Sequence, residues 1–439
     1  MMYPRLKLAR NLLTDDGVIF ISIDEHEITN LMKLANEIFF EENVEIMVWE
    51  KISGGKTAGS GKMKITKRFR KDHEYIIICY KNKSSVNFNK PLRIKKTKNE
   101  YGNKDNDPRG NWMSCEICKS EQKSNPNGKN YYTISTPSGK KITRQWHYSY
   151  DELKKLDSDN RIYWGNGDII PRLKKFLDEP QPVTPSSLIY GLCTQTDGNN
   201  EIKELGLDFD NPKPKMLIQW FTELTTSNSD IVLDFFAGSS TTAHALMDSN
   251  NKFNKNCRFI LIQIPEKIDK KSKAYKEGFT NICEIGKERI RRSGEKILEE
   301  SENKDLDVGF KVFKLYKSNL EKWDTDPNNL EQTLLTSKNN IKSDRTNMDL
   351  VYEIMLKYGI DLTLPIEEYK NLYSIGAGAL IICLGNNITT DIVDDIMEVK
   401  GDSEFTRVVF KDNGFNSDCD KSNIKLSLDA KGIDEFITF

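Results

Sequence analysis

A strand-like run that ends in an acid, a glycine and several hydroxyl residues is the part of this sequence best suited to bind a ligand. It reads DIVLDFFAGSSTTAHALMDSN and covers residues 230–250. Gly238 can adopt backbone angles that other residues avoid, so a ligand can approach the main chain closely there. Ser239, Ser240 and Thr241 follow and can cap a helix. A glycine turn between a strand and a helix usually holds a nucleotide-like ligand.

The number of glycines and the nearby polar residues narrow the choice of ligand. A dinucleotide fingerprint needs three glycines, and this turn lacks that spacing, which disfavours a pyrophosphate. Asp234 at the end of the strand favours a ligand with a cationic amino-acid portion and a nucleoside. The next apolar run ends in LIQIPE, where Gln263 or Glu266 could contact a ribose. An ordinary strand–helix turn without a ligand is the alternative.

Strand and helix patterns on both sides of this turn would position it. Helical spacing of apolar residues predicts helices at LKLARNLL, HEITNLMKLANEIF, KPKMLIQWFTELT, TTAHALMDSN and NICEIGKERIRRSGEKILEE. Apolar runs predict strands at VIFISID, DIVLDFF and CRFILIQIPE, the first of them buried, and an antiparallel pair at VEIMVWEK and HEYIIICYKN. Together they predict an α/β fold with a doubly wound sheet.

Changes in composition divide the chain into four parts. Residues 1–85 and 206–300 carry the α/β pattern, whereas residues 86–205, rich in Lys, Asn, Ser, Tyr and Trp, are interpreted as an inserted recognition module. In that module, NYYTISTPSGKKITRQWHYSYDELKKL predicts two short strands around a turn and then a helix. SENKDLDVG marks the boundary to a C-terminal α/β domain, residues 301–439. There GFKVFKL, ALIICLG and TRVVFKD predict strands, and DLVYEIMLKYGI predicts a helix.

Positive charge is concentrated in one segment of a nearly neutral chain. The net charge is −1, yet residues 51–100 hold fifteen Lys and Arg against three acids, a local charge of +12. This predicts a polyanionic partner and steep salt dependence, because neutralised phosphates release counterions. A solvated loop is the alternative; nearby aromatic, Gly and Ser residues favour nucleic acid. The residues expected to bind DNA are Lys62, Lys64, Lys67, Arg68, Arg70 and Arg144.

Other features of the sequence concern membranes, compartment and metals. GVIFISI and AGALIICLG are the longest apolar runs and are too short to span a bilayer. MMYPRLKLAR lacks the apolar core of a signal peptide, so the sequence predicts a cytoplasmic protein. Cys115 and Cys118 form CEIC without a second pair at metal spacing, so we expect free thiols and no metal site.

Several blocks of the sequence resemble one enzyme family. LDFFAGSSTTAHAL resembles the S-adenosylmethionine motif of amino-group DNA methyltransferases, usually Asp-Phe-Phe-Ala-Gly-Ser-Gly-Thr-Thr, and NPKP at residues 211–214 resembles the segment that completes the cofactor pocket. MMYPRLKLARNLLTDDGVIFISIDEHEITNL, NRIYWGNGDIIPRLKKFLDE and RFILIQIPE are similar, in order, to blocks of Type III restriction–modification modification subunits. The resemblance implies a Rossmann-like methyltransferase fold and methylation of the exocyclic amino group of adenine in DNA. It also implies a homodimer and a restriction subunit with helicase and nuclease activity.

The resemblance also implies roles around the glycine turn. Asp234 would order the turn or bind the cofactor amino group. Phe235 and Phe236 would wall the adenine ring or fill the core, and the core is the expected place for one of them. Ser239, Thr241 and Thr242 would bind the methionine carboxylate or cap the helix, and Lys213 would meet that carboxylate or stay solvated. The residues expected to bind the cofactor are Lys213, Pro214, Asp234, Phe235, Phe236, Ala237, Gly238, Ser239, Thr241, Thr242 and Gln263.

Two departures from the family pattern bear on activity. Ser240 stands where the family usually has glycine. The family's Asp-Pro-Pro-Tyr motif grips the flipped adenine, and none of the fourteen prolines here has a proline beside it. We therefore expect no catalytic residue in this chain, interpret it as an N-terminally truncated member, and expect DNA binding without methylation. The alternatives are a methylation-incompetent, DNA-binding remnant and an RNA methyltransferase.

Overall fold

The structure is a computed structural model of the chain. It describes residues 1–52, 69, 71–90, 92–93, 101–165, 167, 169–177, 179, 181–182, 184–321 and 341–439. Two compact units, Met1–Gly309 and Phe310–Phe439, make up the chain. Within the described residues, no helix combines the length and the apolar character that crossing a bilayer requires.

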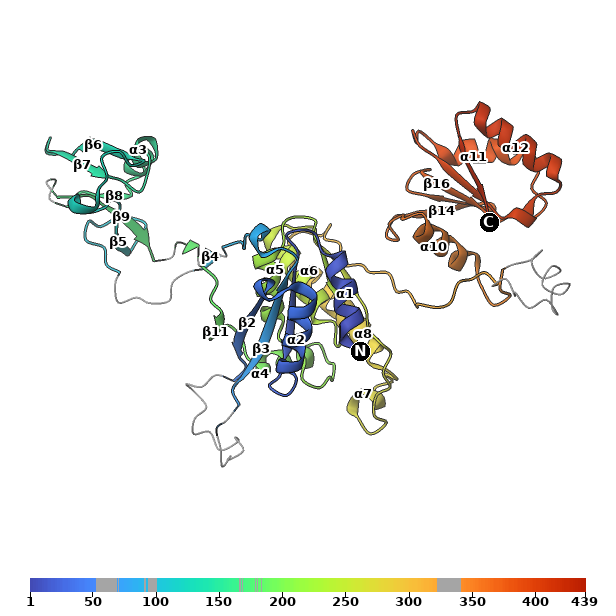
Figure 1. Ribbon diagram of the computed structural model, residues 1–439, viewed down its shortest axis with the longest axis horizontal. Coiled ribbons are helices and arrows are strands. Elements are labelled where there is room, and N and C mark those ends of the chain that lie inside the picture. Colours follow the sequence, from blue (N-terminus) through green and yellow to red (C-terminus); the bar gives the residue numbers. More distant parts are fainter. Residues whose placement is uncertain are drawn as a thin grey trace. The chain divides into compact units, whose positions relative to one another are not determined.

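The first unit contains a four-stranded sheet with helices on both faces (Figure 1). Its elements are α1 (Met2–Leu12), β1 (Val18–Ile23), α2 (Ile28–Phe39), η1 (Glu41–Asn43), β2 (Val44–Glu50), β3 (His73–Tyr80), η2 (Lys83–Ser85), β11 (Leu188–Ile189) and α5 (Lys215–Thr225). The strand order is β1-β3-β2-β11, and only the β2–β11 pairing is parallel. Helices α1 and α2 pack on the face where Ile77 and Cys79 are buried. Helix α5 packs on the other face, where Leu217 and Phe221 join Trp49 in the core.

The helices and strands predicted for this part are confirmed, but the predicted burial of β1 is wrong. All six residues of β1 are partly exposed. In the described structure β1 pairs only with β3 and forms one edge of the sheet. A strand with a neighbour on one side alone leaves part of its apolar surface in contact with water, although its sequence is that of an interior strand.

A second, two-stranded sheet carries the glycine turn. Its surroundings comprise α4 (Gln195–Glu204), β12 (Ile231–Asp234), α6 (Thr241–Phe253), β13 (Arg258–Leu261), α7 (Lys273–Lys276) and α8 (Ile282–Glu300). Strands β12 and β13 are parallel, and α6 packs against α5, α8 and β13. The α/β class is therefore confirmed. The expected single doubly wound sheet is instead described as two sheets, because no ladder joins β12 to β1. Phe235, which follows β12, packs against the same hydrophobic cluster as Ile19 and Ile21 of β1.

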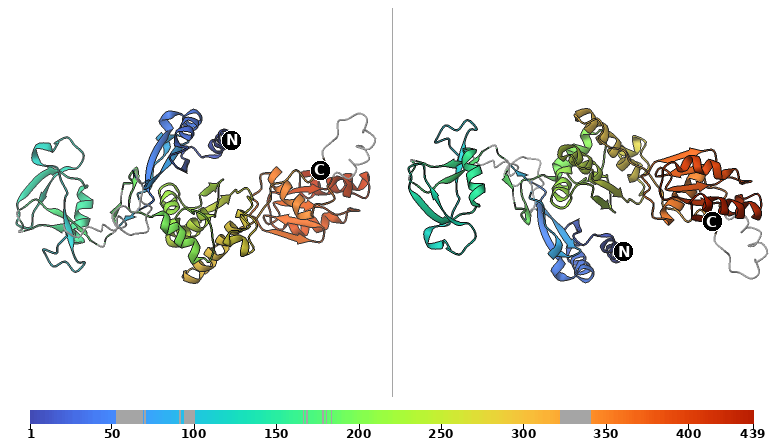
Figure 2. Two further views of the ribbon diagram at one scale, coloured as in Figure 1. Left: turned by 90° about the horizontal axis from the view of Figure 1, so that it is seen from below. Right: turned by 90° about the horizontal axis from the view of Figure 1, so that it is seen from above.

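The segment predicted to be a recognition module has small sheets and one capped helix (teal in Figure 2). Its elements are β4 (Leu92–Arg93), β5 (Trp112–Glu116), η3 (Glu121–Lys123), β6 (Tyr131–Ser135), β7 (Lys141–Gln145), α3 (Tyr150–Ser158), β8 (Ile162–Tyr163), β9 (Arg172–Phe176) and β10 (Gln181–Pro182). The predicted hairpin and helix are confirmed as β6, β7 and α3. Ser149 and Glu152 form a capping box that satisfies backbone donors at the start of α3.

The second unit is a five-stranded sheet between helices. Its elements are α10 (Asn347–Lys357), β14 (Ile366–Tyr369), β15 (Leu372–Ile375), β16 (Leu380–Cys383), α11 (Ile392–Lys400), β17 (Arg407–Phe410), η5 (Asp412–Gly414), α12 (Asp418–Ala430) and β18 (Glu435–Thr438). The strand order is β14-β15-β16-β17-β18, with β16, β17 and β18 parallel. Helix α10 covers one face, and α11 and α12 cover the other (Figure 1). The strand predicted at GFKVFKL is wrong, since that segment pairs with no strand and leaves Val312 and Leu315 exposed.

Candidate cofactor site

The carboxylate of Asp234 holds both ends of the glycine turn. Its Oδ2 accepts a hydrogen bond from Thr242 Oγ1 at 2.6 Å, and its Oδ1 accepts one from the Phe236 backbone N–H at 3.1 Å. One bond reaches into the first turn of α6 and the other into the loop, so the acid fixes the path from β12 to α6. Phe236 is 53% exposed, while Phe235 packs with the hydrophobic cluster of α1, α2 and β3.

The neighbouring strand supports the same turn through Gln263. Gly238 N–H donates to Gln263 Oε1 at 2.7 Å, and the Gln263 amide nitrogen donates to the Ile264 carbonyl at 3.0 Å. The Ala237 N–H donates to the Ile262 carbonyl at 3.2 Å. Gly238 has φ = +52°, which glycine adopts at little cost. Gln263, which was predicted to contact a ribose, thus fixes the backbone of the turn at Gly238 in this structure.

Ser240 adopts the left-handed conformation at the start of α6, with φ = +61°. A non-glycine residue in this region costs on the order of 1 kcal/mol. Its hydroxyl lies over Gly286 of α8, where an added Cβ would stand 2.5 Å from Ser240 Oγ and 3.4 Å from the Gly238 carbonyl oxygen. The serine is therefore accommodated because the facing helix has no side chain at this point.

We predict that substitutions of Ser240 and Gly286 depend on each other. Ser240→Gly is expected to stabilise the turn by about 1 kcal/mol, because the left-handed residue then loses its Cβ. Gly286→Ala is expected to destabilise the protein by about 1 kcal/mol in the natural background, where the new methyl meets Ser240. With Ser240→Gly present, the same alanine is expected to be neutral or stabilising, since alanine favours a helix.

A double-mutant cycle on the full chain measures this dependence, with amide hydrogen exchange of α6 and α8 as the readout. Gly102→Ala is a matched control, because a Cβ there has no neighbour within 4 Å and is expected to change little. Additive effects of the two substitutions would contradict the contact.

The NPKP segment, residues 211–214, is held in place by residues on one face of α4. Gln195 Nε2 donates to the Pro212 carbonyl at 2.7 Å, and Glu201 accepts from the Lys215 N–H at 2.8 Å. Gly198 lies between them, and a Cβ there would stand 2.3 Å from the Pro212 carbonyl oxygen. Positions 195, 198 and 201 recur every three residues and therefore share a helix face. Pro214, predicted to bind the cofactor, is the N-cap of α5.

The Lys213 ammonium points toward the four-stranded sheet. It pairs with Glu74 and lies 5.3 Å from the centre of the Trp49 ring, while Lys51 approaches the same carboxylate at 3.3 Å. The Lys213 carbonyl accepts from Thr241 Oγ1 at 3.3 Å. Lys213 thus reaches the glycine turn through its backbone, and its side chain has an anionic partner in the protein. The predicted contact with a carboxylate of the cofactor stays a prediction.

Ser239 and Thr241, predicted to bind a carboxylate or cap α6, both contact a fully buried arginine. Arg289 Nη1 donates to Ser239 Oγ at 2.9 Å and to Thr241 Oγ1 at 2.7 Å. Sequence reasoning missed this residue within the charged helix α8. A signal was present, because Arg289 lies four residues after Ile285 and four before Ser293, and all three are buried on one face.

Most of the predicted DNA-binding residues lie outside the described part of the chain: Lys62, Lys64, Lys67, Arg68 and Arg70. Arg144, in β7, is described. Its guanidinium donates to Glu121 at 2.8 Å and to the Thr143 carbonyl at 2.9 Å. Among the described residues, no group of three or more metal-ligating side chains is arranged to hold an ion, and Cys115 and Cys118 are free thiols.

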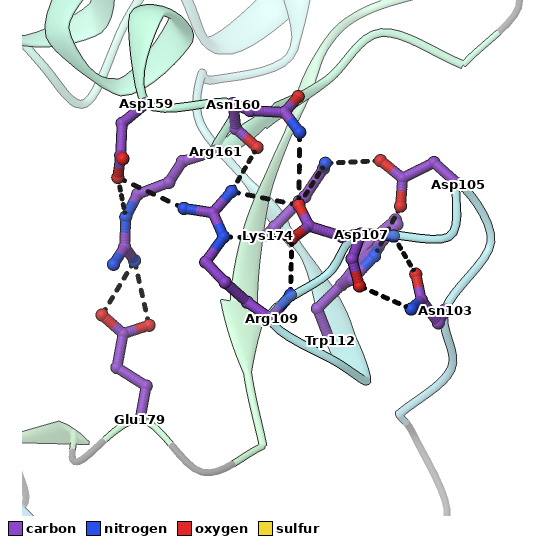
Figure 3. A network of polar contacts seen from close by, with 10 residues as sticks. All are labelled: Asn103, Asp105, Asp107, Arg109, Trp112, Asp159, Asn160, Arg161, Lys174 and Glu179. Carbon is purple, nitrogen blue, oxygen red and sulfur yellow. Dashed lines mark hydrogen bonds and ion pairs between the residues drawn. The ribbon is translucent and has the colours of Figure 1, made fainter.

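The module also contains a polar network that sequence reasoning did not identify (Figure 3). The fully buried carboxylate of Asp107 accepts from Arg109 Nε and Nη2, each at 3.0 Å, and from Lys174 Nζ at 2.9 Å. Lys174, also fully buried, pairs in addition with Asp105, which accepts from Trp112 Nε1 at 2.8 Å. Because the charges are matched and hydrogen-bonded, the network anchors the loop before β5 to strand β9.

Comparisons with known proteins agree with this geometry. A family model described as DNA methylase matches residues 1–291. The Type III restriction-modification enzyme StyLTI Mod subunit of Salmonella typhimurium is 35% identical over 71% of this chain and 47% of its own length. The EcoP15I Mod subunit of Escherichia coli is 29% identical over 95% of this chain and 68% of its own length, and the EcoPI Mod subunit of Escherichia phage P1 is 30% identical over 71% and 52%. The chain thus spans about half the length of two of these relatives.

Among solved structures, the crystal structure of an M1.HpyAVI–SAM complex matches 66% of this chain and 81% of its own, with 14% identity and a TM-score of 0.30. The family model carries the assignment, because it covers more than half of the chain, including the glycine turn and most of α8. The chain belongs to the DNA methylase family.

Proposed function

We propose that this chain holds S-adenosylmethionine and binds double-stranded DNA as part of an adenine-specific DNA methyltransferase of a Type III restriction–modification system. The observation that carries the proposal is the glycine turn itself. Three groups hold it in place from three elements: Asp234 of β12, Gln263 after β13 and Arg289 of α8. A turn fixed from three sides is preorganised for a ligand, so little ordering entropy opposes binding.

The residues at the turn fit the chemistry of S-adenosylmethionine. Phe236, half exposed beside Asp234, offers an aromatic face to the adenine ring. Asp234 offers an anion to the cationic amino group, and the Ser239 hydroxyl above Arg289 offers a donor to the carboxylate. When bound, the cofactor would supply an electrophilic methyl group on a sulfonium. The chain's own residues contribute binding and orientation at this end of the site.

Transfer additionally requires the adenine amino nitrogen to be held in line with that methyl, which accounts for much of the rate acceleration in such reactions. The Asp-Pro-Pro-Tyr motif that performs this task in the family is absent from the 439 residues. We therefore infer that the chain binds the methyl donor weakly and does not methylate by itself.

The partners follow from the same proposal. Duplex DNA would bind through the basic segment 51–100, whose local charge of +12 suits a phosphate backbone. A restriction subunit is inferred from the names of the relatives, which are Mod subunits of Type III restriction-modification enzymes, and a homodimer is inferred only from the resemblance of the sequence to that family. An enzyme with this substrate would act in the cytoplasm, where bacterial DNA lies.

Two measurements on the purified chain test the proposal. Equilibrium dialysis with labelled S-adenosylmethionine up to millimolar concentration should detect weak binding, and Asp234→Ala should weaken it at least tenfold because the turn loses two hydrogen bonds. Incubation with the labelled cofactor and unmethylated genomic DNA should leave the DNA unlabelled.

Glu300→Ala is the matched control for binding, since this exposed acid is the last residue of α8, eleven residues after Arg289. Absence of cofactor binding by the natural chain would overturn the cofactor assignment. Label in DNA would overturn the inference that the chain cannot methylate. Tighter binding to RNA than to duplex DNA of the same sequence would favour an RNA methyltransferase.

A further inference from the structure

The guanidinium of Arg289 lies beneath the glycine turn, with only part of its bonding capacity used. The side chain has 0% exposure, and its Nη1 donates to Ser239 and Thr241. Its Nη2 lies 3.6 Å from Glu201 Oε2, beyond hydrogen-bond distance, and its Nε has no hydrogen-bond partner among the described residues. Burial of a charge with such partial pairing is costly, so another stabilising anion is expected nearby.

The charge of Arg289 also acts on a neighbouring side chain, His244 of α6. Burial lowers the pKa of His244 to about 3, and the positive charges of Arg289 and Lys215 add to this effect, so His244 is neutral at physiological pH. Burial also lowers the pKa of Arg289 to about 10 and raises the pKa of Glu201, which means that the pair compensates its own desolvation only in part. The guanidinium stays charged, and its field reaches the turn through a medium of low dielectric constant.

The two hydroxyls differ in what they can offer a ligand. Thr241 Oγ1 accepts from Arg289 and can donate its own proton to the Lys213 carbonyl at 3.3 Å. Ser239 Oγ also accepts from Arg289, and its other polar contact, Thr241 Oγ1, is likewise 3.3 Å away but is a hydroxyl, which is a weaker acceptor than the carbonyl that Thr241 contacts. Ser239 is 3% exposed, and its proton is less firmly engaged than that of Thr241; a hydroxyl that accepts from a cation is also a stronger donor.

We propose that Arg289 is a positioning residue for the carboxylate of S-adenosylmethionine and acts through the Ser239 hydroxyl. The guanidinium orients that hydroxyl and supplies the positive charge that the carboxylate would otherwise lack, because the Lys213 ammonium is paired with Glu74. This inference rests on the proposed binding of S-adenosylmethionine. It adds that Arg289 and Ser239 lie at the carboxylate end of the bound cofactor.

The test compares S-adenosylmethionine with its decarboxylated analogue, which keeps the sulfonium and the nucleoside but lacks the carboxylate. Equilibrium dialysis or calorimetry on the full chain should show that Arg289→Gln weakens binding of S-adenosylmethionine about tenfold and changes binding of the analogue less than twofold. Ser239→Ala should show the same selectivity, and Arg289→Lys should recover part of the affinity because it keeps the charge.

The double variant separates a relay from two independent contacts. If Arg289 acts through Ser239, then Arg289→Gln combined with Ser239→Ala should weaken binding no more than Arg289→Gln alone. Amide exchange of α6 identifies variants that disturb the fold, and Ser239→Ala keeps the test valid if Arg289→Gln does not fold. Arg292→Gln is the matched control, since Arg292 lies on the same helix and contacts Glu288 and the Leu205 carbonyl instead of the turn.

The possible outcomes distinguish this inference from the function on which it rests. Equal losses for both ligands in Arg289→Gln and Ser239→Ala would overturn the inference, because they would indicate a purely structural role. The proposed cofactor would remain in that case. Failure of the natural chain to bind either ligand would instead overturn the proposed cofactor itself.

Discussion

Asp107→Ala is expected to lower the free energy of opening of strands β5 and β9 by about 3 kcal/mol, because the fully buried Lys174 then keeps only Asp105 and Arg109 loses its nearest carboxylate. Asp107 accepts from Arg109 and Lys174, and the Lys174 side chain is fully buried (Figure 3). Two acids remain, Asp105, which contacts only Lys174, and Asp159, which lies 3.4 Å from Arg109, and neither can replace both interactions. The module that depends on this anchor is therefore expected to open locally or to unfold.

Hydrogen exchange of β5 and β9 in the full chain measures this effect, and a loss of 3 kcal/mol corresponds to exchange roughly a hundredfold faster. Glu116→Ala is the matched control. Glu116 belongs to β5, pairs with Arg172 at 3.4 Å, and its side chain is 73% exposed, so its removal should change little. Exchange as slow in Asp107→Ala as in Glu116→Ala would contradict a stabilising role of the network.

The same carboxylate predicts the response of the module to acid. The hydrogen bonds from Arg109, followed by Lys174, hold the pKa of Asp107 well below its ordinary value. A carboxyl group with a lowered pKa in the folded state stabilises that state fully above its unfolded pKa, which is about 4, and loses the contribution as the pH falls further. Exchange of β5 should accelerate below about pH 4 in the natural chain, and this acceleration should be smaller in Asp107→Ala.

Gly198→Ala is expected to destabilise the contact between α4 and the start of α5 by about 2 kcal/mol and to weaken binding of S-adenosylmethionine. The new methyl would stand 2.3 Å from the Pro212 carbonyl oxygen, 2.9 Å from Pro214 N and 3.0 Å from the Lys213 carbonyl carbon. All three are backbone atoms, so the segment 212–214 must shift. This overpacking exceeds the gain of roughly 1 kcal/mol that alanine brings to a helix.

The shift would carry the Lys213 carbonyl away from Thr241 and so disturb the cofactor turn. Pulse proteolysis of the full chain and dialysis with the labelled cofactor report stability and affinity separately. Asn200→Ala on the exposed side of α4 is the control and should be neutral or slightly stabilising. Unchanged affinity and stability in Gly198→Ala would show that the backbone of residues 212–214 can shift at little energetic cost, which would contradict this prediction.

Local signals were sufficient for the elements but not for their contacts. The strand–glycine–helix pattern at residues 230–250 predicted β12, the turn and α6 because apolar periodicity and turn chemistry are local properties. Asp234 was expected to order the turn, but the side chains that hold it from other elements could not be predicted in the same way. Arg289 and Gln263 follow it by many residues, and their hydrogen bonds depend on how α8 and β13 pack.

Tertiary context also explains the predictions that were wrong. VIFISID is the sequence of a buried strand, yet β1 is partly exposed because it pairs on one side only in the described structure. GFKVFKL has strand propensity, but a strand requires a neighbouring strand, and among the described residues no strand forms a ladder with residues 309–315. In both cases the sequence has the local preference for a strand. Whether a neighbouring strand is present decides if the segment is buried or forms a strand at all.

The packing of Ser240 against Gly286 implies that these two positions evolve as a pair. Where a natural relative has glycine at position 240, the facing helix is free to carry alanine or serine at position 286. Where serine occupies position 240, as here, only glycine at position 286 leaves room for its hydroxyl. Substitutions at positions 240 and 286 are therefore expected to be correlated across many relatives, because the two residues share one contact between the glycine turn and α8.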